Sequence, residues 1–117
     1  MNVVVLSGRV GKTPEVRMTP NNTKAVTFSV AIDRKDKSGN KITDWFNCTS
    51  WGKTAEFVEK YVKSGSAVEV MGSLQTRSWE DDKGKHTIFF ILVDNVNFQQ
   101  GNKRNDNDDD GDMPFET

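Results

Sequence analysis

The chain has 117 residues, 34% of them hydrophobic, and a formal net charge of −1. This length leaves room for one domain with a modest core, and no apolar run approaches the roughly 20 residues of a membrane-spanning helix. The start of the chain lacks a charged segment followed by a long apolar one, so we expect no signal peptide. Cys48 is the only cysteine, which excludes an internal disulfide and suits a reducing cytoplasm.

The small net charge hides a division between a mildly basic body and an acidic tail. Residues 1–99 carry about +3, and residues 100–117 carry about −4. The tail has no apolar periodicity, and we expect it to be disordered because it cannot bury enough surface to offset the entropy of ordering. An apolar tip, Met113 to Phe115, follows the aspartates. The tail is therefore interpreted either as a docking peptide for partner proteins or as a segment that only adds solubility.

β-Branched residues and the alternation of apolar with polar side chains predict strands through most of the body. The first four are expected at residues 2–10, 15–19, 25–32 and 42–51. In the third, larger apolar residues at even positions alternate with small or polar residues at odd positions, which is typical of a half-buried strand. Residues 33–41 are expected to form a charged hairpin loop between the third and fourth strands.

The two-residue alternation of apolar and polar side chains ends after residue 51. Phe57, Val58, Tyr61 and Val62 form one stripe of a short amphipathic helix within residues 52–64, and Ser64-Gly65 is a plausible stop. Further strands are expected at residues 67–72, 74–79 and 87–93, with a hairpin turn at residues 81–85 between the last two. A last piece at residues 95–98 closes the body. This pattern favours an all-β OB-fold, a five-stranded Greek-key barrel with one short helix. An SH3-like barrel is the alternative, although it usually lacks a helix at this point.

The three tryptophans lie beside polar residues rather than within the apolar runs. In the strand at residues 42–51, Trp45 and Trp51 share one face with polar neighbours, while apolar residues occupy the other face. Trp79 has the parity of Arg77, again in polar company. Tryptophan is usually a core residue. Three indoles in polar surroundings nevertheless favour an exposed aromatic face.

Exposed indoles beside cations suit single-stranded nucleic acid. An aromatic ring stacks on any base, contributing ~1–3 kcal/mol without reading the sequence, and Lys and Arg neutralise the phosphates. Double-stranded DNA offers no exposed base faces. The candidate cations are Arg9, Lys12, Arg17, Arg34, Lys35, Lys53, Arg77, Lys83 and Lys85. Lys53 lies near Trp51 in sequence and Arg77 near Trp79, which makes these two cations the strongest candidates.

These motifs resemble the bacterial single-stranded DNA-binding protein family along nearly the whole chain. The likeness is carried by VVLSGRVGKTPEVRMTPN, AVTFSVAIDR, TDWFNCTSWGKTAEFVEKYVKSGSAVEVMGSLQTRSWED and the acidic DDDGDMPF, in this order. The resemblance implies non-sequence-specific binding and protection of single-stranded DNA during replication, recombination and repair. It also implies a cytoplasmic, nucleoid-associated homotetramer, with an OB-fold DNA-binding domain at residues 1–99 and a partner-binding tail at residues 100–117.

The resemblance further assigns roles to individual residues. The implied base-stacking and phosphate-binding residues are Trp45, Trp51, Trp79, Arg9, Arg17, Lys53 and Arg77. The implied docking residues for replication and repair proteins are Asp108, Asp109, Asp110, Asp112, Met113, Pro114 and Phe115. A further aromatic that the family often carries near Arg34 and Lys35 is absent, so this loop is expected to contribute charge. Glu116 and Thr117 follow Phe115, whereas the family typically ends on Pro-Phe, which leaves the strength of docking open.

The sequence does not favour an enzyme, a cofactor or a metal site. His86 is the only histidine and has no Cys or His beside it in sequence. The aspartate run lacks the spaced ligands of an EF-hand. Two other functions remain as alternatives. A scaffold that mainly binds proteins would not need tryptophans on an exposed face. An oligosaccharide-binding barrel fits poorly with the acidic tail and the absent secretion signal.

Overall fold

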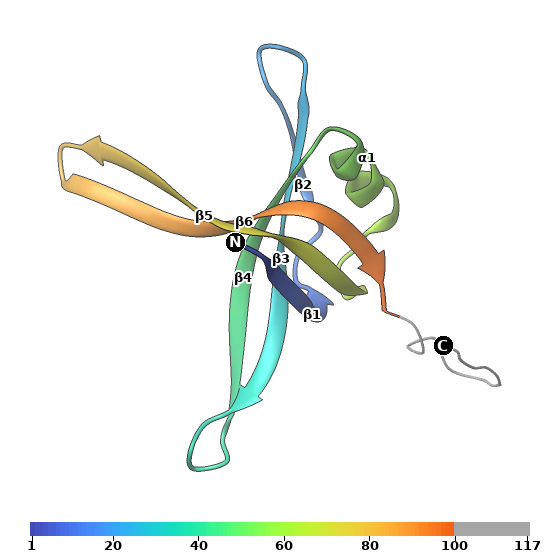
Figure 1. Ribbon diagram of the computed structural model, residues 1–117, viewed down its shortest axis with the longest axis vertical. Helices are drawn as coiled ribbons and strands as arrows, with labels where there is room; N and C mark the ends of the chain where they lie inside the picture. Colours follow the sequence, from blue (N-terminus) through green and yellow to red (C-terminus); the bar gives the residue numbers. More distant parts are fainter. Residues whose placement is uncertain (100–117) are drawn as a thin grey trace, which may run out of the picture.

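The computed structural model describes residues 1–99, and Figure 1 shows a small barrel from which three hairpins project. The strands are β1 (Val4–Val10), β2 (Glu15–Met18), β3 (Lys24–Lys35), β4 (Lys41–Trp51), β5 (Ala67–Asp81) and β6 (Gly84–Phe98). The helix α1 (Gly52–Tyr61) follows β4 and covers one side of the barrel. We expected the tail to be disordered and to hold the docking residues within 108–115. These expectations concern residues outside the described part of the chain.

Five of the strands close into a ring in the order β1, β5, β6, β4, β3 and back to β1. Neighbouring strands are antiparallel except β4 and β6, which pair in parallel at Cys48–Ile91 and Thr49–Leu92. The short β2 pairs with β3 and extends the sheet outside the ring. This connectivity, with one helix after the third strand of the ring, is the OB architecture. The expected fold class is therefore confirmed.

Closure of the ring requires a close approach of β1 to β3, and Gly8 allows it. A Cβ atom on Gly8 would lie 2.4 Å from the carbonyl oxygen of Ala31 and 2.8 Å from Val30 Cγ1. Any side chain at this position would push the two strands apart. The ladder that closes the barrel pairs Arg9 with Ala31, immediately after this glycine.

The core is built largely from valine, whose branched side chain packs well on a pleated sheet. Along β3, Val26, Phe28 and Val30 point inward and are buried, as the alternation predicted. On β4 the buried positions are Cys48 and Ser50. The Ser50 hydroxyl donates to the Val26 carbonyl oxygen at 2.8 Å, so this buried polar group is satisfied. Burial raises the pKa of the Cys48 thiol to about 12, because its thiolate would be desolvated.

The helix ends earlier than the expected stop at Ser64-Gly65, and its buried stripe includes the predicted Val58 and Val62, with Phe57 packed against the core, but not Tyr61. It spans Gly52–Tyr61 rather than residues 52–64. The buried residues in and just after it are Ala55, Val58 and Val62. Tyr61, which we placed on the buried stripe, is 50% exposed and packs on Phe57 with ring centroids 5.2 Å apart. The buried stripe therefore runs through residues spaced by three and four, from Ala55 to Val58 and Val62.

Strands β5 and β6 are each continuous, whereas the sequence divided each into two. On β6 the predicted break corresponds to a bulge, where Asn95 and Val93 are the partners of Met71 and Gly72 and Asp94 is left without a partner on β5. The extra residue interrupts the alternation in the sequence but not the strand. Beyond the bulge the two strands leave the barrel as a long two-stranded arm (Figure 1). On β5 this arm is exposed on both faces.

Candidate nucleic-acid interface

Two tryptophans lie on the outer face of β4. Trp45 is 59% exposed and Trp51 is 44% exposed, while the intervening inward positions are half-buried or buried. This arrangement follows from the two-residue period of a strand, and it agrees with the predicted parity. Six residues separate the two rings, which is roughly 20 Å along a strand. They are therefore presented as two separate flat surfaces rather than as one cluster.

Trp45 lies in a cross-strand row that ends in an arginine. Trp45 pairs with Ala31 of β3, and Ala31 pairs with Arg9 of β1. Neighbouring strands are about 4.8 Å apart, so the Arg9 backbone lies roughly 10 Å from that of Trp45. The indole also lies against Gly11, where a Cβ atom would be 2.6 Å from Trp45 Cζ3. Arg9 Nη1 donates to the Gly65 carbonyl oxygen at 3.2 Å, which holds its charge on this outer face.

Trp51, the last residue of β4, also lies in a cross-strand row that ends in an arginine. It pairs with Ala25 of β3, and Ala25 pairs with Arg17 of β2. The Arg17 guanidinium lies 3.5 Å from the Glu15 carboxylate, and both side chains are exposed. Such a pair contributes little to stability, so Arg17 can exchange Glu15 for another anion. Lys53 adds a second cation in the first turn of α1, which contains no acidic residue and has no side-chain cap.

Trp79 lies on the arm formed by β5 and β6 and is 42% exposed. The Arg77 Cζ atom is 5.6 Å from the centre of its ring, which is within the range of a cation–π contact. His86, directly opposite on β6, stacks on the indole with ring centroids 5.3 Å apart and an interplanar angle of 27°. His86 Nε2 lies 3.0 Å from Asp81 Oδ1. The end of the arm therefore gathers an indole, a guanidinium and an imidazole.

The tryptophans of β4 and of the arm belong to one continuous outer face of the sheet. Thr49, which has the parity of the β4 tryptophans, pairs with Leu92 of β6, and Leu92 pairs with Ser73 of β5. Alternation along β5 from Ser73 then places the side chains of Arg77 and Trp79 on the same face. Strand pairing thus places on one face rings that are up to 34 residues apart in sequence.

His86 is the residue at this surface that the sequence analysis missed. It was interpreted only as a lone histidine near a hairpin turn at residues 81–85. In the structure Asp81 pairs with Gly84 across a two-residue turn, and this register sets Trp79 opposite His86. A tight turn at residues 82–83 was the signal that would have identified the pair.

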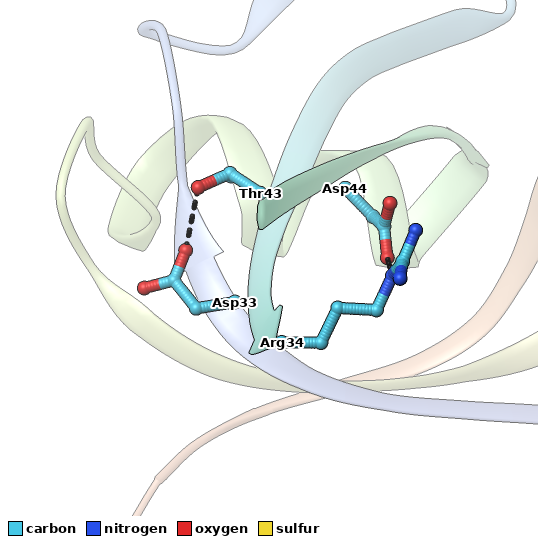
Figure 2. A network of polar contacts seen from close by, with 4 residues as sticks. All are labelled: Asp33, Arg34, Thr43 and Asp44. Carbon is cyan, nitrogen blue, oxygen red and sulfur yellow. Dashed lines mark hydrogen bonds and ion pairs between the residues drawn. The ribbon is translucent and has the colours of Figure 1, made fainter. Parts of the chain in front are cut away.

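The arm formed by β3 and β4 carries polar contacts at Arg34 and its neighbours (Figure 2). Thr43 Oγ1 donates to Asp33 at 2.7 Å on the side of the tryptophans, and Arg34 Nε donates to Asp44 at 2.7 Å on the opposite side. The Thr43 hydrogen bond, with Lys41 nearby, lowers the pKa of the Asp33 carboxyl despite its partial desolvation. Part of the charge expected from this loop is therefore paired within the arm itself.

A concavity of about 490 Å³ lies at the other end of β5 and β6, and its lining contains none of the candidate residues. Within residues 1–99, no three His, Cys, Asp or Glu side chains gather in a way that would hold a metal ion. In the same part of the chain, no helix has the length and apolar character needed to cross a membrane.

Barrel and surface together define an OB-fold protein whose outer face presents separate aromatic rings beside arginines and a lysine. The model of the single-strand binding protein family matches residues 1–99. The chain belongs to this family.

Curated relatives and a solved structure agree with this assignment. The chain is 41% identical over 101 residues to the single-stranded DNA-binding protein of Bacillus cereus and 42% identical over 101 residues to single-stranded DNA-binding protein A of Bacillus subtilis. Each match covers 84% of this chain but 59% of the relative, so the chain spans about three-fifths of their length. Single-stranded DNA-binding protein 3 of Streptococcus agalactiae is 38% identical over 107 residues, which cover 90% of this chain and 77% of that protein.

Among solved structures, the Plasmodium falciparum SSB complex with ssDNA is similar with a TM-score of 0.77 and 28% sequence identity. The superposed region covers 85% of this chain and 95% of that chain.

Proposed function

We propose that this protein binds single-stranded DNA without reading its sequence and protects it during replication, recombination and repair. The observation that carries the proposal is the set of three exposed tryptophans on one outer face. The proposal is supported by the family, by the names of the relatives and by the similar Plasmodium falciparum structure, which is a complex with ssDNA. The proposed role is binding rather than catalysis.

In this proposal, bases stack on Trp45, Trp51 and Trp79 while cations meet the phosphates between them. Stacking uses the flat face that every base has, so it does not select a sequence. The proposed phosphate-binding residues are Arg9, Arg17, Lys53 and Arg77. Arg17 reaches a phosphate by leaving Glu15, an exposed partner that costs little to release. An oligosaccharide-binding barrel would use the same rings, but arginines in the rows of both β4 tryptophans suit an anionic chain better.

We extend the proposal to organisation and partners. Residues 1–99 form the DNA-binding domain, and residues 100–117 recruit replication and repair proteins through the acidic run and its apolar tip. The protein assembles as a homotetramer and acts in the cytoplasm, on the nucleoid. Assembly is supported by the low hydrophobic content and by Val5 and Met71, which are exposed and paired with each other on the outer face of β1 and β5.

Titration with oligo(dT) at several salt concentrations tests the proposed binding. Stacking on the indoles should quench tryptophan fluorescence strongly. The logarithm of the binding constant should fall linearly with the logarithm of salt, with a slope of about −0.7 for each phosphate contacted. Unchanged fluorescence at saturating oligonucleotide, or binding that does not respond to salt, would contradict the proposal.

Replacing one stacking ring should weaken binding by a predictable amount. Trp51→Ala is expected to reduce the free energy of oligo(dT) binding by ~1–3 kcal/mol, because one base loses its aromatic platform. Tyr61→Ala is the matched control, since this ring is also half exposed but lies on α1 against Phe57. Equal affinities for Trp51→Ala and the parent protein would remove Trp51 from the interface.

A further inference from the structure

Trp79 differs from the other two tryptophans in having an aromatic partner. Within residues 1–99, ring-to-ring contacts occur in the cluster around Phe57 and between Trp79 and His86. Trp45 and Trp51 instead lie on the barrel wall, with Gly11 beneath the former and Ala25 beside the latter. The imidazole therefore occupies a position for which the β4 tryptophans have only backbone or a methyl group.

The partner of Trp79 is itself held in place by the hairpin turn. Asp81 Oδ1 accepts the backbone N–H of Lys83 at 2.8 Å, which fixes the carboxylate at the start of the turn. The same oxygen lies 3.0 Å from His86 Nε2. A chain of contacts thus runs from the turn through Asp81 and His86 to the indole of Trp79.

Apart from His86, the only side chain that the structure places against the Trp79 ring within residues 1–99 is that of Arg77. From Leu74 to Asp81, every residue of β5 is exposed, so no core lies beneath this part of the arm. Arg77 contacts the ring, but its long side chain has many rotamers and is also a candidate for a phosphate. A ring that moves freely must be ordered when a base stacks on it, and this ordering reduces affinity.

We propose that His86 is a positioning residue for single-stranded DNA binding: held by Asp81, it stacks on Trp79 and keeps the indole in the orientation that receives a base. This inference rests on the proposed function and deepens it by adding a residue that acts through Trp79 rather than on the DNA.

The first test compares two replacements of the imidazole in the full chain. His86→Ala removes the stacked ring and should weaken oligo(dT) binding roughly two- to tenfold. His86→Phe keeps a ring without the hydrogen bond and should retain most of the affinity. Thr87→Ala is the matched control, because the adjacent Thr87 lies on the opposite face of the arm, 3.0 Å from the Ser78 hydroxyl. Its affinity should equal that of the parent protein.

The second test asks whether His86 acts through Trp79. In a Trp79→Ala background, His86→Ala should cause no further loss, because residues that act as one unit are not additive. In a variant whose only indole is Trp79 (Trp45→Phe with Trp51→Phe), His86→Ala should lower the fluorescence anisotropy of the free protein. If His86 only stabilised the arm, His86→Ala would still weaken oligo(dT) binding in the Trp79→Ala background.

Three results would overturn the inference. They are parent-like affinity of His86→Ala, affinity of His86→Phe as low as that of His86→Ala, and additive losses with Trp79→Ala, which would mean that His86 acts independently of Trp79. Failure of the parent protein to bind oligo(dT) would instead refute the proposed function. Binding by the parent together with any of the three results would refute only the positioning role.

Discussion

Gly11 is a residue whose missing side chain sets the position of a candidate stacking ring. A Cβ atom there would lie 2.6 Å from Trp45 Cζ3 and 2.8 Å from Ser29 Oγ, closer than real contacts allow. The indole therefore lies directly on the backbone at the end of β1. A ring supported from below has less freedom to lose when a base stacks on its other face.

Gly11→Ala should consequently weaken DNA binding without touching DNA. The added methyl group forces Trp45 away from its preferred rotamer, at a cost on the order of 1 kcal/mol in binding free energy. Oligo(dT) titration and the emission spectrum of the free protein would show the change. Thr13→Ala, at an exposed position two residues further on, is the control and should behave as the parent. Parent-like emission and affinity of Gly11→Ala would show that the ring does not depend on this contact.

At the scale of elements, the two long arms are stabilised by different contacts between their strands. Both extend beyond the barrel (Figure 1), and no residue is buried in β3 after Val30, in β4 before Cys48 or in β5 after Gly72. The arm of β5 and β6 uses the stacked Trp79 and His86, whereas the arm of β3 and β4 uses the Asp33–Thr43 and Arg34–Asp44 pairs. Cross-strand contacts of both kinds stabilise two-stranded sheets that lack buried apolar surface.

The arm of β3 and β4 should therefore be sensitive to acid. The pKa of Asp33 is lowered mainly by the Thr43 hydroxyl and further by Lys41. Since the folded value lies below the unfolded one, the contact stabilises the arm above about pH 4. This contribution is lost as the pH falls through the folded value. An NMR titration of the Asp33 carboxyl and amide exchange along the arm measure the effect.

Asp33→Asn is the informative variant for this prediction, because it removes the ionisable group while keeping the shape. Its arm should exchange amides at a rate that changes little between neutral pH and pH 3, once intrinsic exchange is corrected for. Asp82→Asn, in the turn of the other arm, leaves the Asp33 contacts in place and should retain the acid sensitivity. An Asp33 carboxyl that titrates at or above the ordinary value would contradict the prediction.

At the scale of the whole molecule, charge is divided between a body of about +3 and a tail of about −4. An acidic segment linked to a cationic surface competes with phosphates for the same arginines. Deleting residues 105–117 should therefore preserve or tighten oligo(dT) binding, and the difference should shrink as salt screens the charges. Replacing the aspartates at 108–110 and 112 with Asn separates charge from length. Weaker DNA binding after deletion would contradict this competition.

Much of the fold could be predicted because two strands show a regular alternation of apolar and polar residues and one segment after β4 shows helical spacing instead. The same two-residue period showed that Trp45 and Trp51 face outward. Predictions from periodicity were wrong where the chain departs from a regular pattern. The bulge that leaves Asp94 without a cross-strand partner made the continuous strand β6 look like two. Tyr61 was misplaced because an exposed ring can pack on Phe57 as well as on a core.

The surface around the rings was harder to predict than the rings themselves. The row from Arg9 through Ala31 to Trp45 exists only because β1 closes onto β3, a pairing between residues more than 20 apart in sequence. The stack of His86 on Trp79 depends on the register of a two-residue turn. The first pairing leaves no local signal in composition or periodicity, and the second could be found only by placing the tight turn at residues 82–83. Strand pairing, and not residue type alone, therefore defines the neighbours of each tryptophan.

The burial of Cys48 has a practical consequence for experiments on this protein. Only the thiolate reacts with alkylating reagents, and this thiol is 1% exposed with a pKa of about 12. It becomes reactive when the barrel opens, so the alkylation rate of the native protein reports how often opening occurs. A cysteine introduced on either arm can carry a dye while Cys48 remains in place and unlabelled.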